Sequence, residues 1–179
     1  TKIVQDTLRK IAGIDAEVPV TVKSEFQYEY RNKSQIPVGV DKNGENVIGF
    51  YAERSHRIVP VKNCPIHPVW AEQVIEAFHG YMSECGVRGY DETTGKGTLR
   101  HIVVRDVDGC FIVVAVTAGD ALLHAEKLKA RLAQYVTTFS LWQNHYGGQG
   151  NGVCGDTFRL LYGKHSLFDR AYATRSRSA

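Results

Sequence analysis

The first third of the chain alternates between apolar and polar positions in the manner of β-strands. Aromatic residues occupy every second position from Phe26 to Tyr30, which is the spacing of a half-buried strand. The residues DKNG at 41–44 have the composition of a tight turn, and an apolar, aromatic run follows them. We therefore expect a hairpin over residues 26–52, followed by a third strand over 57–62.

Apolar residues three and four positions apart predict three helices. The first covers residues 2–12 and stops at Gly13, a residue type that commonly ends helices. The second covers about residues 68–84 and opens with a proline, which suits the first turn of a helix. The third follows Asp120, whose side chain can cap it, and its apolar positions continue to Val136.

The remaining elements are strands, and their order sets the fold class. The clearest is a hairpin whose turn has the sequence DVDG at 106–109, between two runs of β-branched residues. A glycine-rich connection at 147–152 lacks the Lys-Ser/Thr pair of a phosphate loop. The order of elements predicts an α+β fold, in which a mainly antiparallel sheet carries two helices packed on one face around a βαββαβ-like core. Further extended segments are expected at 101–105, 111–117, 138–144, 153–161 and 166–168.

Composition places the chain among ordinary globular proteins. Its 179 residues are enough for one domain with a real core, and 43% of them are hydrophobic, which excludes disordered and collagen-like classes. The four cysteines form no Cys-x-x-Cys pair, so neither a zinc ribbon nor a disulfide framework is indicated, and a reducing, cytoplasmic setting is expected. No apolar run is long enough to span a bilayer, and the N-terminus lacks the features of a signal peptide.

The net charge of +3 permits a nucleic-acid partner without requiring one, so the placement of charge has to decide. Three clusters at expected strand ends or exposed faces combine cations with amides, imidazoles or aromatic rings, which are groups that bind phosphates and unstacked bases. The alternative is that the tyrosines are core residues and the cations a solvated edge. The candidates are Tyr30, Arg31, Lys33 and Gln35 in the first cluster, Arg54 and His56 in the second, and Arg100, His101 and Arg105 in the third.

No catalytic triad is recognisable in the sequence. A lone strand histidine such as His101 is more often a hydrogen-bonded structural residue than a general base. Cys85 and Cys110 occupy apolar positions of a helix and a strand, where a core role is the simpler interpretation. Cys64 lies in a loop just before a helix, where a thiolate can act as a ligand or a nucleophile. A small hydrolase or redox enzyme that uses Cys64 and a nearby histidine is therefore one hypothesis.

Five short motifs occur in the order in which one enzyme family carries them. They are YRNKSQ at 30–35, GFY at 49–51, RSHRIV at 54–59, CPI at 64–66 and LRH at 99–101. Together they resemble the RNA (uracil-5-)-methyltransferase family, and its bacterial 23S ribosomal RNA members in particular. The similarity covers nearly the whole chain, because WQN at 142–144 and LLYG at 160–163 resemble the stretch that leads into the family's S-adenosylmethionine domain.

The resemblance implies a fragment of a larger enzyme. Members of this family have an N-terminal OB-like RNA-binding domain, a central α+β domain and a C-terminal Rossmann-like methyltransferase domain, and this chain matches only the middle one. We expect residues 1–14 to be a linking helix that packs on the missing methyltransferase domain, 15–170 to be the central domain, and 171–179 to be a disordered or vector-derived tail. The chain alone is then expected to be inactive and to hold no cofactor, whereas the intact protein uses S-adenosylmethionine and a 4Fe–4S cluster.

The resemblance also implies roles for single residues. The family's nucleophilic cysteine and its base lie in the absent domain, and none of the four cysteines of this chain matches the nucleophile. Cys64 matches the fourth ligand of the iron–sulfur cluster, whose other ligands precede residue 1, so we expect its thiol to be unligated here. The cations of the three clusters would grip ribosomal RNA, with Tyr30 and Tyr51 as candidates for stacking on its bases. A stand-alone RNA-binding module without catalysis is the alternative hypothesis.

Overall fold

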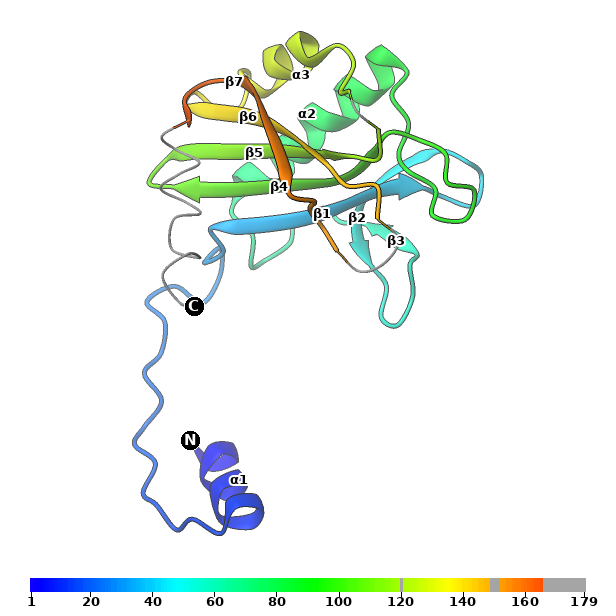
Figure 1. Ribbon diagram of the computed structural model, residues 1–179. Coiled ribbons are helices and arrows are strands. Elements are labelled where there is room, and N and C mark those ends of the chain that lie inside the picture. Colours follow the sequence, from blue (N-terminus) through cyan, green and yellow to red (C-terminus); the bar gives the residue numbers. More distant parts are fainter. Residues whose placement is uncertain (120, 149–151, 166–179) are drawn as a thin grey trace.

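The computed structural model describes residues 1–119, 121–148 and 152–165, which form an α+β fold (Figure 1). The helices are α1 (Lys2–Ala12), α2 (Val69–Cys85) and α3 (Ala125–Leu132). The strands are β1 (Lys33–Val40), β2 (Asn46–Tyr51), β3 (Ile58–Pro60), β4 (Leu99–Val107), β5 (Cys110–Thr117), β6 (Phe139–His145) and β7 (Thr157–Tyr162). The predicted fold class, a mainly antiparallel sheet with two helices on one face, is confirmed.

The described strands form one seven-stranded sheet in the order β3-β2-β1-β4-β5-β6-β7. Neighbouring strands within it are antiparallel except β5 and β6. Parallel neighbours need a crossover connection, and the segment that contains α3 provides it. Strand β3 is the first in this order, so the short β2–β3 hairpin lies at one edge of the sheet, next to β1.

Helices α2 and α3 cover one face of the sheet and form the main core with it (Figure 1). The side chains of Val74, Phe78 and Tyr81 in α2 are fully buried, as are those of Leu128 and Leu132 in α3. Because these residues recur at intervals of three or four, each helix presents one apolar stripe to the sheet. Each large apolar side chain contributes about 1.5–3 kcal/mol on burial, so this layer anchors the fold.

The central strands also bury side chains on the face away from the helices. In β4, Ile102 and Val104 belong to the main core, whereas Val103 belongs to a second cluster with Val114 and Trp142. Side chains of the β7 region pack against this second cluster. Strands that are buried on both faces have continuous apolar sequences, which is why β5 shows little alternation.

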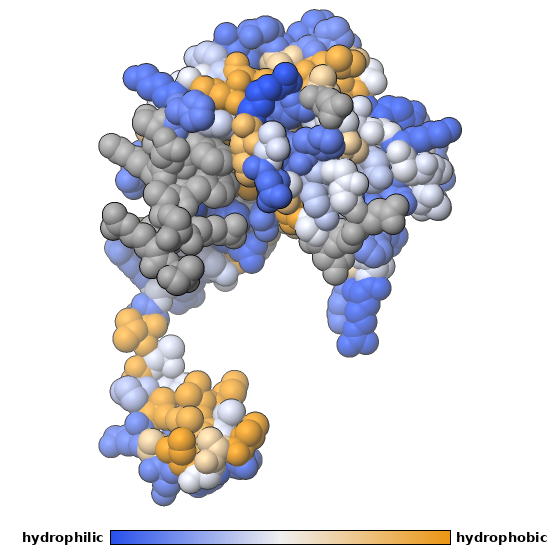
Figure 2. Space-filling view, in the orientation of Figure 1, coloured by the Kyte–Doolittle hydropathy of each residue, from blue (hydrophilic) through white to orange (hydrophobic). Residues whose placement is uncertain are grey.

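Helix α1 stands apart from the sheet (Figure 1). It lies at the predicted position and ends at Gly13, whose φ of 65° falls in the left-handed region. None of its residues is buried, and Ile3 and Ile11 are each 82% exposed. Figure 2 shows apolar residues on the surface of this helix. Within the described ranges, no helix combines the length and the apolar character that a membrane span requires.

The predicted strand over 26–31 is wrong. Phe26, Tyr28 and Tyr30 are each more than half exposed, and the first strand, β1, begins further along and pairs with β2 around the predicted turn. Instead of pairing with a strand, the 26–31 segment meets the loop at 65–66 through two backbone hydrogen bonds. The aromatic residues do alternate in the sequence, but their side chains are exposed instead of covering a core.

Other differences concern where elements begin. Helix α3 starts at Ala125 because His124 has a left-handed backbone with a φ of 54°, and a right-handed helix does not continue through such a residue. The third strand is present but covers only Ile58–Pro60. Asp120, the expected strand at 166–168 and the tail at 171–179 lie outside the described residues.

Candidate functional site

A pocket of about 920 Å³ lies between the β2–β3 hairpin and the strands β1 and β4. The tip of this hairpin forms a hydrophilic projection at the surface (Figure 2). The pocket brings together candidates from all three sequence clusters, and Glu92 from the loop before β4 joins them. The predicted RNA-binding residues that line it are Gln35, Tyr51, Arg54, His56 and His101.

The tight turn of the hairpin holds Arg54 and His56 at the pocket rim. The Ala52 N–H donates to the Arg57 carbonyl at 2.8 Å, and the N–H and hydroxyl of Ser55 both donate to the Ala52 carbonyl at 3.1 Å. At the tip, the Arg54 side chain is 91% exposed. Its Nε lies 3.5 Å from a carboxylate oxygen of Glu53, an exposed ion pair that is weak enough to open when a phosphate competes for the cation.

Tyr51 forms part of the aromatic wall. Its ring meets the His56 ring edge-on, with the centroids 5.9 Å apart. Burial raises the pKa of Tyr51, and the charge of Glu92 raises it further, so the phenol remains protonated at neutral pH. Tyr51 therefore offers a hydrogen-bonding hydroxyl next to an aromatic surface.

His101 lines the pocket from β4, just after a shift in the β4–β5 register. The residue is 6% exposed, so its expected position on an exposed face is wrong. Its Nδ1 has no hydrogen-bond partner among the described residues. Burial lowers the pKa of His101 to about 4, and the charge of Arg100 acts in the same direction. The imidazole is therefore neutral at pH 7 and supplies hydrogen-bonding capacity instead of positive charge.

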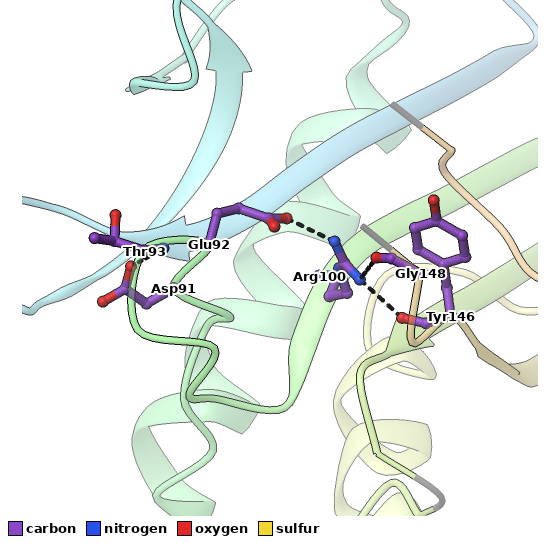
Figure 3. A network of polar contacts seen from close by, with 6 residues as sticks. All are labelled: Asp91, Glu92, Thr93, Arg100, Tyr146 and Gly148. Atoms are coloured by element: carbon purple, nitrogen blue, oxygen red, sulfur yellow. Dashed lines mark hydrogen bonds and ion pairs between the residues drawn. The ribbon is translucent and has the colours of Figure 1, made fainter. Parts of the chain in front are cut away.

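Arg100 is only 2% exposed, so its expected position on an exposed face is also wrong. Its guanidinium donates to the Glu92 carboxylate at 2.7 Å and to the carbonyls of Tyr146 and Gly148 at 2.9 and 2.8 Å (Figure 3). The same group lies over the rings of Tyr90 and Tyr146, 4.4 and 4.7 Å from their centroids. A planar cation with five donors tolerates burial when carboxylate, carbonyl and aromatic partners surround it. Arg100 thus ties the loop before β4 to the segment after β6.

Glu92, which the sequence analysis missed, is held by a structured loop. The Asp91 carboxylate accepts hydrogen bonds from the Thr94 hydroxyl at 2.8 Å and the Thr93 N–H at 2.9 Å (Figure 3 shows Asp91 and Thr93). These bonds, that from Thr94 first, lower the pKa of Asp91. The run DETTGKG is rich in turn-forming residues, which was the available signal. The contact between Glu92 and Arg100 depends on tertiary structure and gives no local pattern.

The other candidates lie beyond the pocket. Lys33 is opposite Arg105 in the β1–β4 ladder. It is on the same face of β1 as Gln35, two residues or about 7 Å away along the strand. Tyr30 and Arg31 are exposed in the segment that precedes β1. These candidates extend the surface along β1 without lining the pocket.

Cys64 contacts His67, which stands three positions later in CPIH and identifies the nearby histidine that the hydrolase or redox hypothesis had left unnamed. The Cys64 Sγ is 3.2 Å from the His67 Nδ1, and the His67 Nε2 is 3.1 Å from the Ser34 hydroxyl. These residues line a second pocket of about 290 Å³. Burial, followed by the charge of Arg31, lowers the pKa of His67. The lowered pKa favours the neutral ring over the imidazolium cation that activates a thiolate in Cys–His enzymes.

A metal cluster does not fit the described residues by themselves. They contain no group of three or more His, Cys, Asp or Glu side chains that is arranged to hold a metal ion. A 4Fe–4S cluster takes four thiolates, and Cys64 supplies one. Cys85 packs against the main core, as expected, and Cys110 is half-buried in β5.

Known proteins similar to this chain are RNA methyltransferases. An uncharacterized RNA methyltransferase of Listeria monocytogenes is 33% identical over 174 residues, which are 96% of this chain and 38% of that protein. Those of Clostridium tetani and Halalkalibacterium halodurans are 38% and 37% identical and match 93% and 94% of this chain, but only 36% and 37% of their own length. No family model matches the chain.

A solved structure shows the same fold. The tRNA (uracil-54, C5)-methyltransferase of Pyrococcus abyssi, in complex with S-adenosyl-L-homocysteine, superimposes with a TM-score of 0.68 at 23% sequence identity. The match covers 91% of this chain and 37% of the archaeal one. The chain spans a little over a third of the length of its curated relatives. Along nearly its whole length, the chain is therefore a relative of these bacterial RNA methyltransferases.

Proposed function

We propose that this chain is the central RNA-binding domain of a bacterial 23S ribosomal RNA uracil-5 methyltransferase, with catalysis located in other parts of the parent protein. The observation that carries the proposal is the pocket of about 920 Å³ that gathers Gln35, Tyr51 and Arg54. Relatives named RNA methyltransferases support the reaction class. The archaeal neighbour, whose structure holds S-adenosyl-L-homocysteine, supports S-adenosylmethionine as the methyl donor of the parent protein.

The chemistry of the pocket suits unstacked RNA. Proteins recognise single-stranded RNA by stacking bases on aromatic rings, by hydrogen bonds to base edges and by cations on the phosphates. Tyr51, Gln35 and Arg54 provide one group of each kind. A uridine that is methylated at carbon 5 has to leave its stack, which also loosens its neighbours. A domain that holds those neighbours would keep the target uridine within reach of the catalytic domain.

Binding of the 179-residue chain to a short uridine-containing ribosomal RNA stem-loop across a salt series tests this function. We expect measurable binding at low salt that weakens steeply as salt rises, because cations on phosphates release counterions. Arg54→Glu should weaken binding. It should also make the slope of log affinity against log salt shallower by about 1, which is the contribution of one phosphate contact. Lys42→Glu is the matched control, since it makes the same charge change at the exposed β1–β2 turn, at the other end of β2. Absence of binding at low salt, or equal losses in both variants, would contradict the proposal.

We further propose that Cys64 supplies one thiolate ligand to an iron–sulfur cluster in the longer parent protein. The support is the family resemblance of the CPI motif and the half-buried thiol beside the smaller pocket. In the purified parent protein, Cys64→Ser should remove the visible absorption of the cluster and its iron content, while Cys85→Ser should keep both. Equal iron content in Cys64→Ser and wild type would refute this role. A reducing cytoplasm, the proposed location, agrees with Cys64, Cys85 and Cys110 being in no disulfide.

A further inference from the structure

We propose that the pocket beside the β2–β3 hairpin seats one nucleobase taken out of its stack, and that Glu92 makes this pocket prefer guanine to uracil. The inference rests on the proposed RNA-binding function and adds the class of base that the pocket receives. The seated base is a neighbour of the methylated uridine in the RNA, not that uridine itself.

The pocket is large enough to admit a nucleobase, and its walls offer surfaces on which a base can stack. Its volume of about 920 Å³ lies within the range of small-molecule sites, roughly 300–1,000 Å³. Tyr51 provides aromatic surface and Pro37 provides a further apolar one. Stacking on such walls tolerates any base, because every base has a π-face. Selection therefore has to come from the polar groups that line the pocket.

Glu92 is the polar group that discriminates most strongly. Its Oε1 is tied to Arg100 at 2.7 Å, which fixes the carboxylate, while the side chain remains 47% exposed. A carboxylate only accepts hydrogen bonds, and its two oxygens have room for several donors. The Watson–Crick edge of guanine offers two neighbouring donors, the N1–H and the exocyclic amine. The corresponding edge of uracil offers a single N–H with a carbonyl oxygen on each side. A carboxylate repels these two oxygens.

The lining also contains Glu53, which pairs with Arg54 at 3.5 Å, and two neutral polar residues that can bind guanine. The Gln35 amide has donors for the guanine O6, and the neutral imidazole of His101 adds hydrogen-bonding capacity in the same pocket. An acid among residues that bind phosphates is otherwise unfavourable, because a carboxylate repels the RNA backbone. Pairing with Arg100 offsets the negative charge of Glu92 and leaves its lone pairs for a base.

Three oligouridine strands of about ten nucleotides, with uridine, guanosine or inosine at the centre, test this inference by fluorescence anisotropy with the 179-residue chain. We expect the guanosine strand to bind about tenfold more tightly than the uridine strand. The inosine strand, which lacks the exocyclic amine, should fall between them. Equal affinities, or a preference for uridine, with salt-dependent binding retained would overturn the base selection and leave the proposed function standing. If no strand binds at low salt, the proposed function fails as well.

Variants locate the selection at Glu92. Glu92→Gln should lose the roughly tenfold preference for guanosine and still bind the uridine strand. Glu45→Gln, which neutralises an exposed carboxylate at the opposite end of β2, should keep the preference. Tyr51→Ala should weaken binding of all three strands by a similar factor, since stacking is tolerant of the base. A Glu92→Gln protein that still prefers guanosine overturns the assignment. The inosine comparison uses the wild-type chain and so holds even if Glu92→Gln perturbs the loop.

Discussion

The guanidinium of Arg100 and the carboxylate of Glu92 are 2.7 Å apart, although Arg100 is almost fully buried and Glu92 is close to half exposed. The pair joins the buried end of β4 to the rim of the proposed RNA-binding pocket. Because Arg100 also donates to Tyr146 and Gly148, one side chain fixes two loops that are distant in sequence (Figure 3). The shape of the pocket therefore depends on a residue whose cation does not reach solvent.

Removal of this tie should destabilise the fold. Arg100→Met leaves two carbonyls without their donor and frees the Glu92 loop, so we expect the free energy of unfolding to fall by about 2–4 kcal/mol. Arg100→Lys should recover only part of this loss, because a single ammonium does not reproduce the planar fork of donors. Urea denaturation measures both effects. Arg9→Met on the exposed helix α1 is the control and should stay within about 0.5 kcal/mol of wild type. Equal stability of Arg100→Met and wild type would show that the tie is dispensable.

Stability should fall as the pH falls from 6.5 toward 4. Because burial lowers the pKa of His101 to about 4 from an ordinary value of 6.5, the unfolded chain takes up a proton more readily than the folded one. The contribution of His101 is therefore complete above pH 6.5 and is lost through this window, by up to about 3 kcal/mol at roughly 1.4 kcal/mol per pKa unit. Urea midpoints at a series of pH values measure the decline.

A His101→Gln variant separates this residue from the other histidines. Its stability should decline less steeply with falling pH than that of wild type, because the buried titrating group is gone. The decline should not vanish, since the pKa values of His67 and His79 are also lowered by burial. Parallel slopes for His101→Gln and wild type would contradict the assignment.

A side chain at Gly49 should disrupt the hairpin that carries the pocket. A Cβ at this position would overlap the carbonyl of Val59 in the neighbouring strand β3. We expect Gly49→Ala to cost about 1–3 kcal/mol of stability and to weaken RNA binding, because β3 has to move away from β2. Gly119→Ala is the matched control, since its Cβ meets no atom within 4 Å. Thermal unfolding and RNA binding of the two variants give the comparison, and equal behaviour would argue against the overlap.

Deletion of residues 1–22 should leave the sheet domain as stable as before. No α1 residue is buried, so the deletion removes almost no core surface. Both tryptophans, Trp70 and Trp142, are buried in the sheet domain and report its unfolding by fluorescence. We expect the free energy of unfolding, measured by urea denaturation, to differ from that of the full chain by less than about 0.5 kcal/mol. A clear loss of stability would mean that α1 packs on the domain in solution.

The sequence alone predicted the elements that rest on local chemistry. The turn at 41–44, the hairpin around 106–109 and the helices at 2–12 and 68–84 are set by turn residues, glycine stops and apolar spacing, and all four are present. The strand expected at 26–31 shows the limit of this reasoning. Alternation states which face is apolar, but only tertiary structure decides whether a surface exists to cover that face.

The candidate site also has residues that the sequence identified and residues whose role only the tertiary structure revealed. The ordered motifs indicated the family resemblance and named Gln35, Tyr51 and Arg54, because residue types and their order are written in the chain. The roles of Arg100 and Glu92 were decided by tertiary structure. An arginine carries the same charge in the sequence whether it is exposed, like Arg54, or buried, like Arg100. Only the folded chain, by excluding water and supplying partners, determines which of the two is available to a ligand and which holds the pocket in shape.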